Sequence, residues 1–207
     1  MKKSFFIFFL LNFLFMSISG AYAYEKKVGI FYDERFLLHD TGPNHPENSE
    51  RLIPVIRDLK KNDQITSNTI WPNFDIATDE ELSLAHSREY IELVDRQVSQ
   101  LNNNRTYLST GDTAISKDSN LVAKLAVGAG LEAVDQIITG DLSSAFALVR
   151  PPGHHASTSI GMGFCVYNSI AVVARYLQKK YGLERILIVD FDVHHGNGTQ
   201  DIFYEDN

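Results

Sequence analysis

Residues 185–198 read RILIVDFDVHHGNG, and the prediction of the fold class starts from this stretch. Its first part, 185–191, is apolar on both faces, which is typical of a strand in the middle of a parallel sheet. Two carboxylates and two histidines lie at the carboxyl end of that predicted strand. Elsewhere in the chain, strand-like apolar runs alternate with helical patterns. The sequence therefore predicts one α/β domain, a parallel sheet with helices on both faces.

The remaining elements follow from periodicity and from turn residues. Short apolar runs predict further strands at 27–32 and 145–149. Long polar stretches at 33–50 and 102–117 predict surface loops. Apolar residues at helical spacing, with start signals such as the acidic turn at 78–81, predict helices. The expected helices cover residues 51–59, 87–101, 120–138 and 168–177.

Composition excludes several classes of protein. The chain has 207 residues, of which 44% are hydrophobic and 22% charged, so it is neither disordered nor a coiled coil. Its net charge is −7, which disfavours nucleic acid as a partner because phosphate binding needs a positive surface. The single cysteine, Cys165, excludes an internal disulfide and a zinc site built from cysteines.

The first 23 residues have the pattern of a secretory signal peptide. Lys2 and Lys3 precede an apolar run over 4–18, and Ala21-Tyr22-Ala23 supplies a cleavage site. The run of about 15 residues is shorter than the roughly 20 needed to span a bilayer. We therefore expect export to the periplasm or the medium, with membrane contact only during export and the folded domain over 24–207. An uncleaved segment that anchors the chain in the inner membrane is the alternative.

Two motifs carry the candidate chemistry, and each follows a predicted strand. Asp190, Asp192 and His194 share one face of the last strand, because residues two apart point the same way. Carboxylate oxygen and imidazole nitrogen suit a divalent ion such as zinc, although at least one further ligand has to come from elsewhere. His154 and His155 lie in a loop after the strand at 145–149, where they suit general acid and base catalysis.

Together these segments resemble the histone deacetylase and acetylpolyamine amidohydrolase superfamily, in its class II-like, bacterial branch. The matching motifs are RPPGHHA at 150–156, GMGFCVYNS at 161–169 and VDFDVHHGNGTQ at 189–200. His45-Pro46-Glu47 with Arg51, and the segment 85–91, resemble the N-terminal part of the same family. The resemblance covers Val28 to the C-terminus and implies an arginase/deacetylase-like fold.

The resemblance also implies roles for individual residues. Asp192 and His194 would be two of three zinc ligands, and a structural potassium ion would bind near them and Asp190. His154 and His155 would be the catalytic pair. Asp190 would hydrogen-bond His154, and Asn197 would hold His155. Gly163 and Phe164 would line the acyl tunnel, and Arg51 would lie deeper, near the acetate pocket. Asp112 would be the loop acid that orients the substrate.

The implied reaction is zinc-dependent hydrolysis of an acetyl-lysine or of an acetylated amine such as an acetylpolyamine. The family's third zinc ligand and its transition-state tyrosine lie in a C-terminal half that does not match this sequence. We therefore expect the domain to be truncated at its C-terminus, with weak metal binding and little or no turnover.

Three other readings stay open. An arginase-like two-metal hydrolase needs a carboxylate two residues after His194, where this chain has Gly196. A cysteine hydrolase would use Cys165, which lies in an apolar context more typical of a buried residue. A non-catalytic fragment that binds acetylated ligands is the third.

Overall fold

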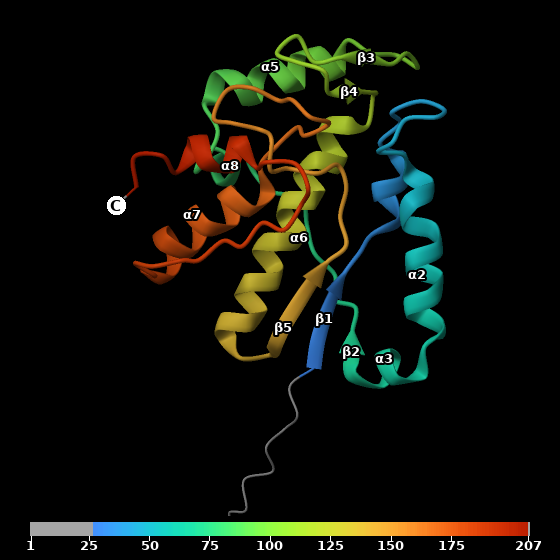
Figure 1. Ribbon diagram of the computed structural model, residues 1–207, viewed down its shortest axis with the longest axis vertical. Coiled ribbons are helices and arrows are strands. Elements are labelled where there is room, and N and C mark those ends of the chain that lie inside the picture. Colours follow the sequence, from blue (N-terminus) through green and yellow to red (C-terminus); the bar gives the residue numbers. More distant parts are fainter. Residues whose placement is uncertain (1–26, 207) are drawn as a thin grey trace, which may run out of the picture.

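The computed structural model describes residues 27–206, and the predicted signal segment lies outside them (Figure 1). Its central strand is β1 (Lys27–Phe31). β2 (Thr69–Ile70) and β5 (Leu142–Ala147) pair with β1 on either side, both in parallel, in the order β2-β1-β5. The predicted α/β fold, with a parallel sheet and flanking helices, is confirmed.

The helices begin and end close to where the sequence places them. Side-chain caps mark several starts: Thr78 and Glu81 form a reciprocal capping box, and Ser87 accepts the Tyr90 N–H. The α-helices are α2 (Leu52–Lys61), α3 (Asp63–Asn68), α4 (Asp79–Leu82), α5 (Arg88–Ser99), α6 (Ser119–Thr139), α7 (Ser169–Tyr181) and α8 (Asn197–Ile202).

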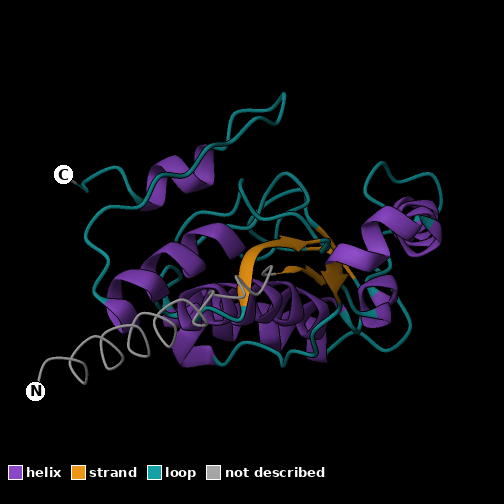
Figure 2. Cartoon of the chain, turned by 90° about the horizontal axis from the view of Figure 1, so that it is seen from below, coloured by secondary structure: helices purple, strands orange, loops and turns teal. Residues whose placement is uncertain are grey.

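Helix α6 organises the core. It packs on one face of the sheet (Figure 2). There Leu125 and Ala129 meet Phe31 and Leu142 in one buried cluster. Its other side joins a second cluster with α5 and α7. The helix passes so close to residue 75 that a Cβ on Gly128 would collide with the Asp75 carbonyl. Small residues in α6 are therefore a packing requirement.

The two polar stretches contain short elements that the sequence did not reveal. Residues 33–50 include the 3₁₀ helix η1 (Glu34–Leu38) and the start of η2 (Ser49–Arg51). Residues 102–117 include a small antiparallel pair, β3 (Thr106–Tyr107) with β4 (Ala114–Ile115). Ile115 is fully buried, so this segment is anchored to the core.

The strand predicted at 185–191 is not formed, so this prediction was wrong. The segment has no regular secondary structure and pairs with no strand, and Leu187 and Phe191 are 86% and 96% exposed. A strand that is apolar on both faces is stable only when neighbours cover both faces. Among residues 27–206, β5 pairs on its β1 edge alone, and Phe146 on β5 is half exposed.

No helix that the structure describes combines the length and the apolar character that crossing a membrane requires.

Candidate functional site

The two histidines of the loop after β5 lie side by side, each with its own partner. The ring centroids of His154 and His155 are 4.1 Å apart. His154 Nδ1 lies 2.8 Å from Asp190 Oδ2, and His155 Nδ1 lies 2.6 Å from Asn197 Oδ1. Both pairings are those that the family resemblance implies. The unpaired segment 185–191 and helix α8 thus still bring their side chains to the histidine loop.

These partners determine where protons sit on the two rings. A carboxylate or an amide oxygen only accepts, so Nδ1 of each ring donates and Nε2 is left as the basic atom. The hydrogen bond from His154 lowers the pKa of the Asp190 carboxyl, and a backbone N–H from Asp192 adds to this. Asp190 therefore stays ionised and holds His154 in one orientation.

Asp192 and His194 form the predicted metal-binding pair. Asp192 Oδ1 accepts the backbone N–H of His194 at 2.7 Å and lies 3.1 Å from His194 Nδ1. Both side chains are at least half exposed. Their donor atoms are of the kind that zinc prefers, but within residues 27–206 no group of three His, Cys, Asp or Glu side chains is placed to hold an ion. Asp192 and His194 supply two suitable donors, and a zinc site needs at least one more.

Gly163 lies against the ring of His155, and Phe164 packs on His45. Gly163 has φ +55°, and a Cβ there would collide with the His155 ring. Its N–H donates to Asp112 Oδ1 at 2.7 Å, so the loop acid holds this turn in place. Phe164 also has a positive φ, and its ring meets the edge of His45 at a centroid distance of 4.6 Å. Residue 163 has to be a glycine because its backbone is in contact with the His155 ring.

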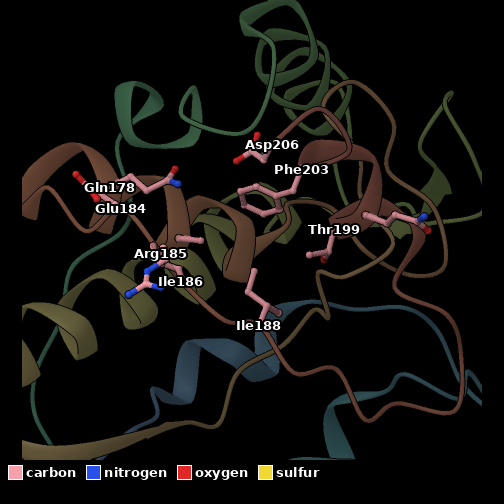
Figure 3. Close-up of a pocket in the computed structure, with 10 residues that line it drawn as sticks. Gln178, Glu184, Arg185, Ile186, Ile188, Thr199, Phe203 and Asp206 are labelled. Atoms are coloured by element: carbon pink, nitrogen blue, oxygen red, sulfur yellow. The ribbon is translucent and has the colours of Figure 1, made fainter.

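Two hollows adjoin these residues. One, of about 450 Å³, is lined by His45, Tyr107, Asp112 and Phe164, of which Asp112 and Phe164 are predicted substrate-contacting residues. The other, of about 400 Å³, lies between the proline-histidine loop and residues 188–192, and His154 and Asp190 line it. A third pocket, between α7, residues 184–188 and α8, contains none of the predicted site residues (Figure 3).

Arg51 does not lie where the sequence reading put it. Its side chain is 59% exposed and reaches Glu47 at 3.6 Å, whereas we expected it deeper, near an acetate pocket. The residue ends η2 at the start of α2, on a turn that faces outward, so its guanidinium stays on the surface.

The cation buried next to the histidine loop is Arg150, which sequence reasoning did not assign a role. Its guanidinium is paired with both Glu47 carboxylate oxygens at 2.9 Å. It also donates to the carbonyls of Phe36 and His39. The sequence did offer a signal that Arg150 is important, because the residue stands between a strand and two prolines at the site. Its partner Glu47 could not be inferred, because it lies 103 residues away.

His39 lies beside this ion pair and is neutral. Burial and the Arg150 charge lower its pKa to about 3, so the 3.7 Å approach of Nε2 to Glu47 is not an ion pair at neutral pH. Nδ1 of His39 is hydrogen bonded to Ser119 Oγ at 2.7 Å.

Cys165 is unsuited to act as a nucleophile. The side chain is fully buried, and burial raises the pKa of its thiol to about 12. A thiolate is the reactive form, so this removes the support for a cysteine hydrolase.

Comparison with known proteins identifies the family. The model of the histone deacetylase domain matches residues 45–207. The chain belongs to the histone deacetylase family. Histone deacetylase 5 of Arabidopsis thaliana is 38% identical over 199 residues, covering 88% of this chain and 29% of that protein. Polyamine deacetylase HDAC10 of Rattus norvegicus is 48% identical over 132 residues, covering 63% of this chain and 22% of that protein.

A solved histone deacetylase structure confirms the fold. The HDA15 HD domain superposes with a TM-score of 0.81 at 36% identity, covering 88% of this chain and 51% of that one. The chain therefore spans about half of that domain and less than a third of the two relatives named above. Membership of the class II-like, bacterial branch stays a prediction.

Proposed function

We propose that this chain carries the histidine pair of an amide hydrolase that removes acetyl groups from acetylated amines. The observation that carries the proposal is the double pairing of His154 with Asp190 and His155 with Asn197, inside the segment that matches the deacetylase domain. Relatives named as histone deacetylases and polyamine deacetylases support the same reaction class.

The pair supplies the two proton transfers of amide hydrolysis. With Nδ1 fixed as the donor on both rings, Nε2 takes a proton from the attacking water and returns one to the leaving amine. Water and the amide thereby become acetate and a free amine. The two rings are in contact, with centroids 4.1 Å apart, so one bound amide could reach both of them.

Zinc is the metal that we propose for this site, with Asp192 and His194 as two of its donors. When bound, zinc would polarise the acetyl carbonyl and lower the pKa of its bound water. A third donor has to complete the shell, so we expect the chain by itself to bind zinc weakly and to turn over little or no substrate. A potassium ion near Asp190 remains part of the proposal.

The substrate class follows from the entrance and from the charge. An acetylated lysine or polyamine has a flexible chain that could enter through the hollow beside Phe164, His45 and Asp112. We also propose export, which rests on the N-terminal sequence. Removal of Lys2 and Lys3 with the signal would change the net charge from −7 to −9, which favours cationic amines. Mass spectrometry of the exported protein should find Tyr24 as the first residue.

The test uses two proteins: this chain, and a completed protein in which it is fused to the remaining part of the HDA15 domain. Zinc titration and hydrolysis of an acetylpolyamine and an acetyl-lysine peptide are measured for both. We expect weak zinc binding and no turnover by the chain, and turnover by the completed protein. A completed protein that folds and binds zinc but hydrolyses neither substrate would overturn the proposal. Normal turnover by the chain alone would support the proposed reaction and would contradict the expectation that the chain needs a further zinc donor.

A further inference from the structure

Asn168 lies beneath the histidine pair, in a position that the catalytic assignment leaves unused. Its side chain is fully buried at the start of α7. Oδ1 accepts the Ala171 N–H at 3.2 Å, as an N-cap residue does. Capping needs only that oxygen, so it does not explain the two hydrogen bonds made by the amide nitrogen.

Those two bonds join the histidine loop to helix α8. Nδ2 donates to the Ala156 carbonyl at 3.0 Å and to Thr199 Oγ1 at 3.0 Å. Ala156 directly follows the histidine pair, and Thr199 lies two residues after Asn197. Both hydrogens of the Asn168 amide are thus used between the loop that carries His155 and the helix that carries its partner.

Two further contacts keep the same two segments together. The Thr199 N–H donates to the His154 carbonyl at 3.1 Å. Gly198 packs so closely on the loop that a Cβ would collide with the Ala156 carbonyl. On the other side, the Asn168 N–H donates at 2.9 Å to Nε2 of the buried His86. Asn168 therefore lies in a rigid junction whose geometry fixes the separation of His155 and Asn197.

We propose that Asn168 is a positioning residue for the histidine pair: through Ala156 and Thr199 it holds α8 at the distance that makes the His155–Asn197 hydrogen bond. The catalytic consequence rests on the proposed function, whereas the positioning itself does not. Loss of this junction leaves Asn197 free to move from His155, and the ring then loses its fixed tautomer.

The test measures the hydrogen bond directly, on the chain itself, by NMR of ¹⁵N-histidine-labelled protein. Asn168→Asp keeps the capping oxygen and removes both donor hydrogens, so the Ala156 carbonyl loses its partner and Thr199 keeps only the longer contact of its own hydroxyl with that oxygen, 3.4 Å in the parent. Thr199→Val removes the α8 partner without touching the α7 cap, and Thr199→Ser restores the hydroxyl. Asn62→Ala removes an asparagine cap from α3 and controls for lost capping alone.

We expect exchange of the His155 Nδ1 proton with water to speed up about fivefold or more in Asn168→Asp and Thr199→Val, as loss of one hydrogen bond predicts. Thr199→Ser and Asn62→Ala should stay within about twofold of the parent. In the completed protein, kcat should fall roughly tenfold with KM unchanged. If Asn168→Asp or Thr199→Val leaves the proton's exchange unchanged, or if Asn62→Ala speeds it equally, the proposal is overturned, whether or not the completed protein is a deacetylase.

Discussion

His155 Nδ1 lies 2.6 Å from Oδ1 of Asn197, a residue 42 positions later at the start of α8. The amide oxygen accepts, so the ring proton is held on Nδ1 and Nε2 is available as a base. Asn197 Nδ2 in turn points to Met162 Sδ at 3.4 Å, which leaves Oδ1 as the atom that faces the ring.

Replacing Asn197 by alanine should impair catalysis more than binding. The completed protein with Asn197→Ala is expected to lose roughly 10–100-fold in kcat, because the second histidine is no longer fixed. KM for an acetylpolyamine should be unchanged. Steady-state kinetics give both numbers, and an unchanged kcat would show that the ring needs no such partner.

Arg150 should matter for stability rather than for chemistry. Arg150→Met leaves the Glu47 carboxylate buried without its cation, which should lower the free energy of unfolding by about 3–5 kcal/mol. The double variant Glu47→Gln with Arg150→Met should recover part of this loss. Arg57→Ala, which breaks an exposed pair with Asp58, should cost less than about 1 kcal/mol. Urea unfolding measures all three, and equal losses for Arg57 and Arg150 would contradict the prediction.

Gly163→Ala should disturb the site itself. The new methyl group collides with the His155 ring, so we expect kcat of the completed protein to fall roughly 10–100-fold. Gly182→Ala is the matched control: Gly182 also has a positive φ, but nothing lies within 4 Å of the added Cβ. Both variants should lose about 1 kcal/mol of stability from backbone strain. If Gly182→Ala lowers kcat as much, strain alone explains the effect.

Two buried histidines make the fold sensitive to acid. Burial lowers the pKa of His39 to about 3 and that of His86 to about 4, below the value of about 6.5 in the unfolded chain. Between pH 6.5 and 4 the unfolded chain binds more protons, so the free energy of unfolding rises with pH. The contribution is complete above about pH 6.5 and is lost as pH falls toward 4.

At pH 5 each of these histidines should therefore lower stability by about 2 kcal/mol relative to pH 7.5. Urea unfolding at both pH values measures the difference. His86→Gln, which keeps an acceptor for the Asn168 N–H, should remove about half of it. The same pH dependence in the parent and in His86→Gln would assign the effect to other groups.

The helices were predictable because their evidence is local. The α6 residues Leu125 and Ala129 repeat at helical spacing, and Gly140 supplies the left-handed end. The prediction of a strand at 185–191 failed, because a strand forms only beside neighbouring strands, and the local sequence pattern does not report whether those neighbours are present. Leu187 and Phe191 have strand character and are nevertheless exposed.

Some features of the candidate site could likewise be predicted from the sequence, and others could not. The motifs identified His154, His155, Asp190, Asp192 and His194, but the strand spacing that was to put the last three on one face does not apply, because residues 185–194 form no strand. The ion pair of Arg150 with Glu47 spans 103 residues, and the bond from Asn168 to Thr199 spans 31. Such contacts are set by the packing of separate elements, so sequence periodicity does not contain them.

The role of the histidine pair in proton transfer is tested most directly by kcat of the completed protein with His155→Ala. Its zinc content and melting temperature have to match those of the parent. A residue that transfers a proton in the reaction should contribute roughly 10²–10⁴-fold. We expect a loss of that size for hydrolysis of an acetylated amine. A kcat within about twofold of the parent would contradict it.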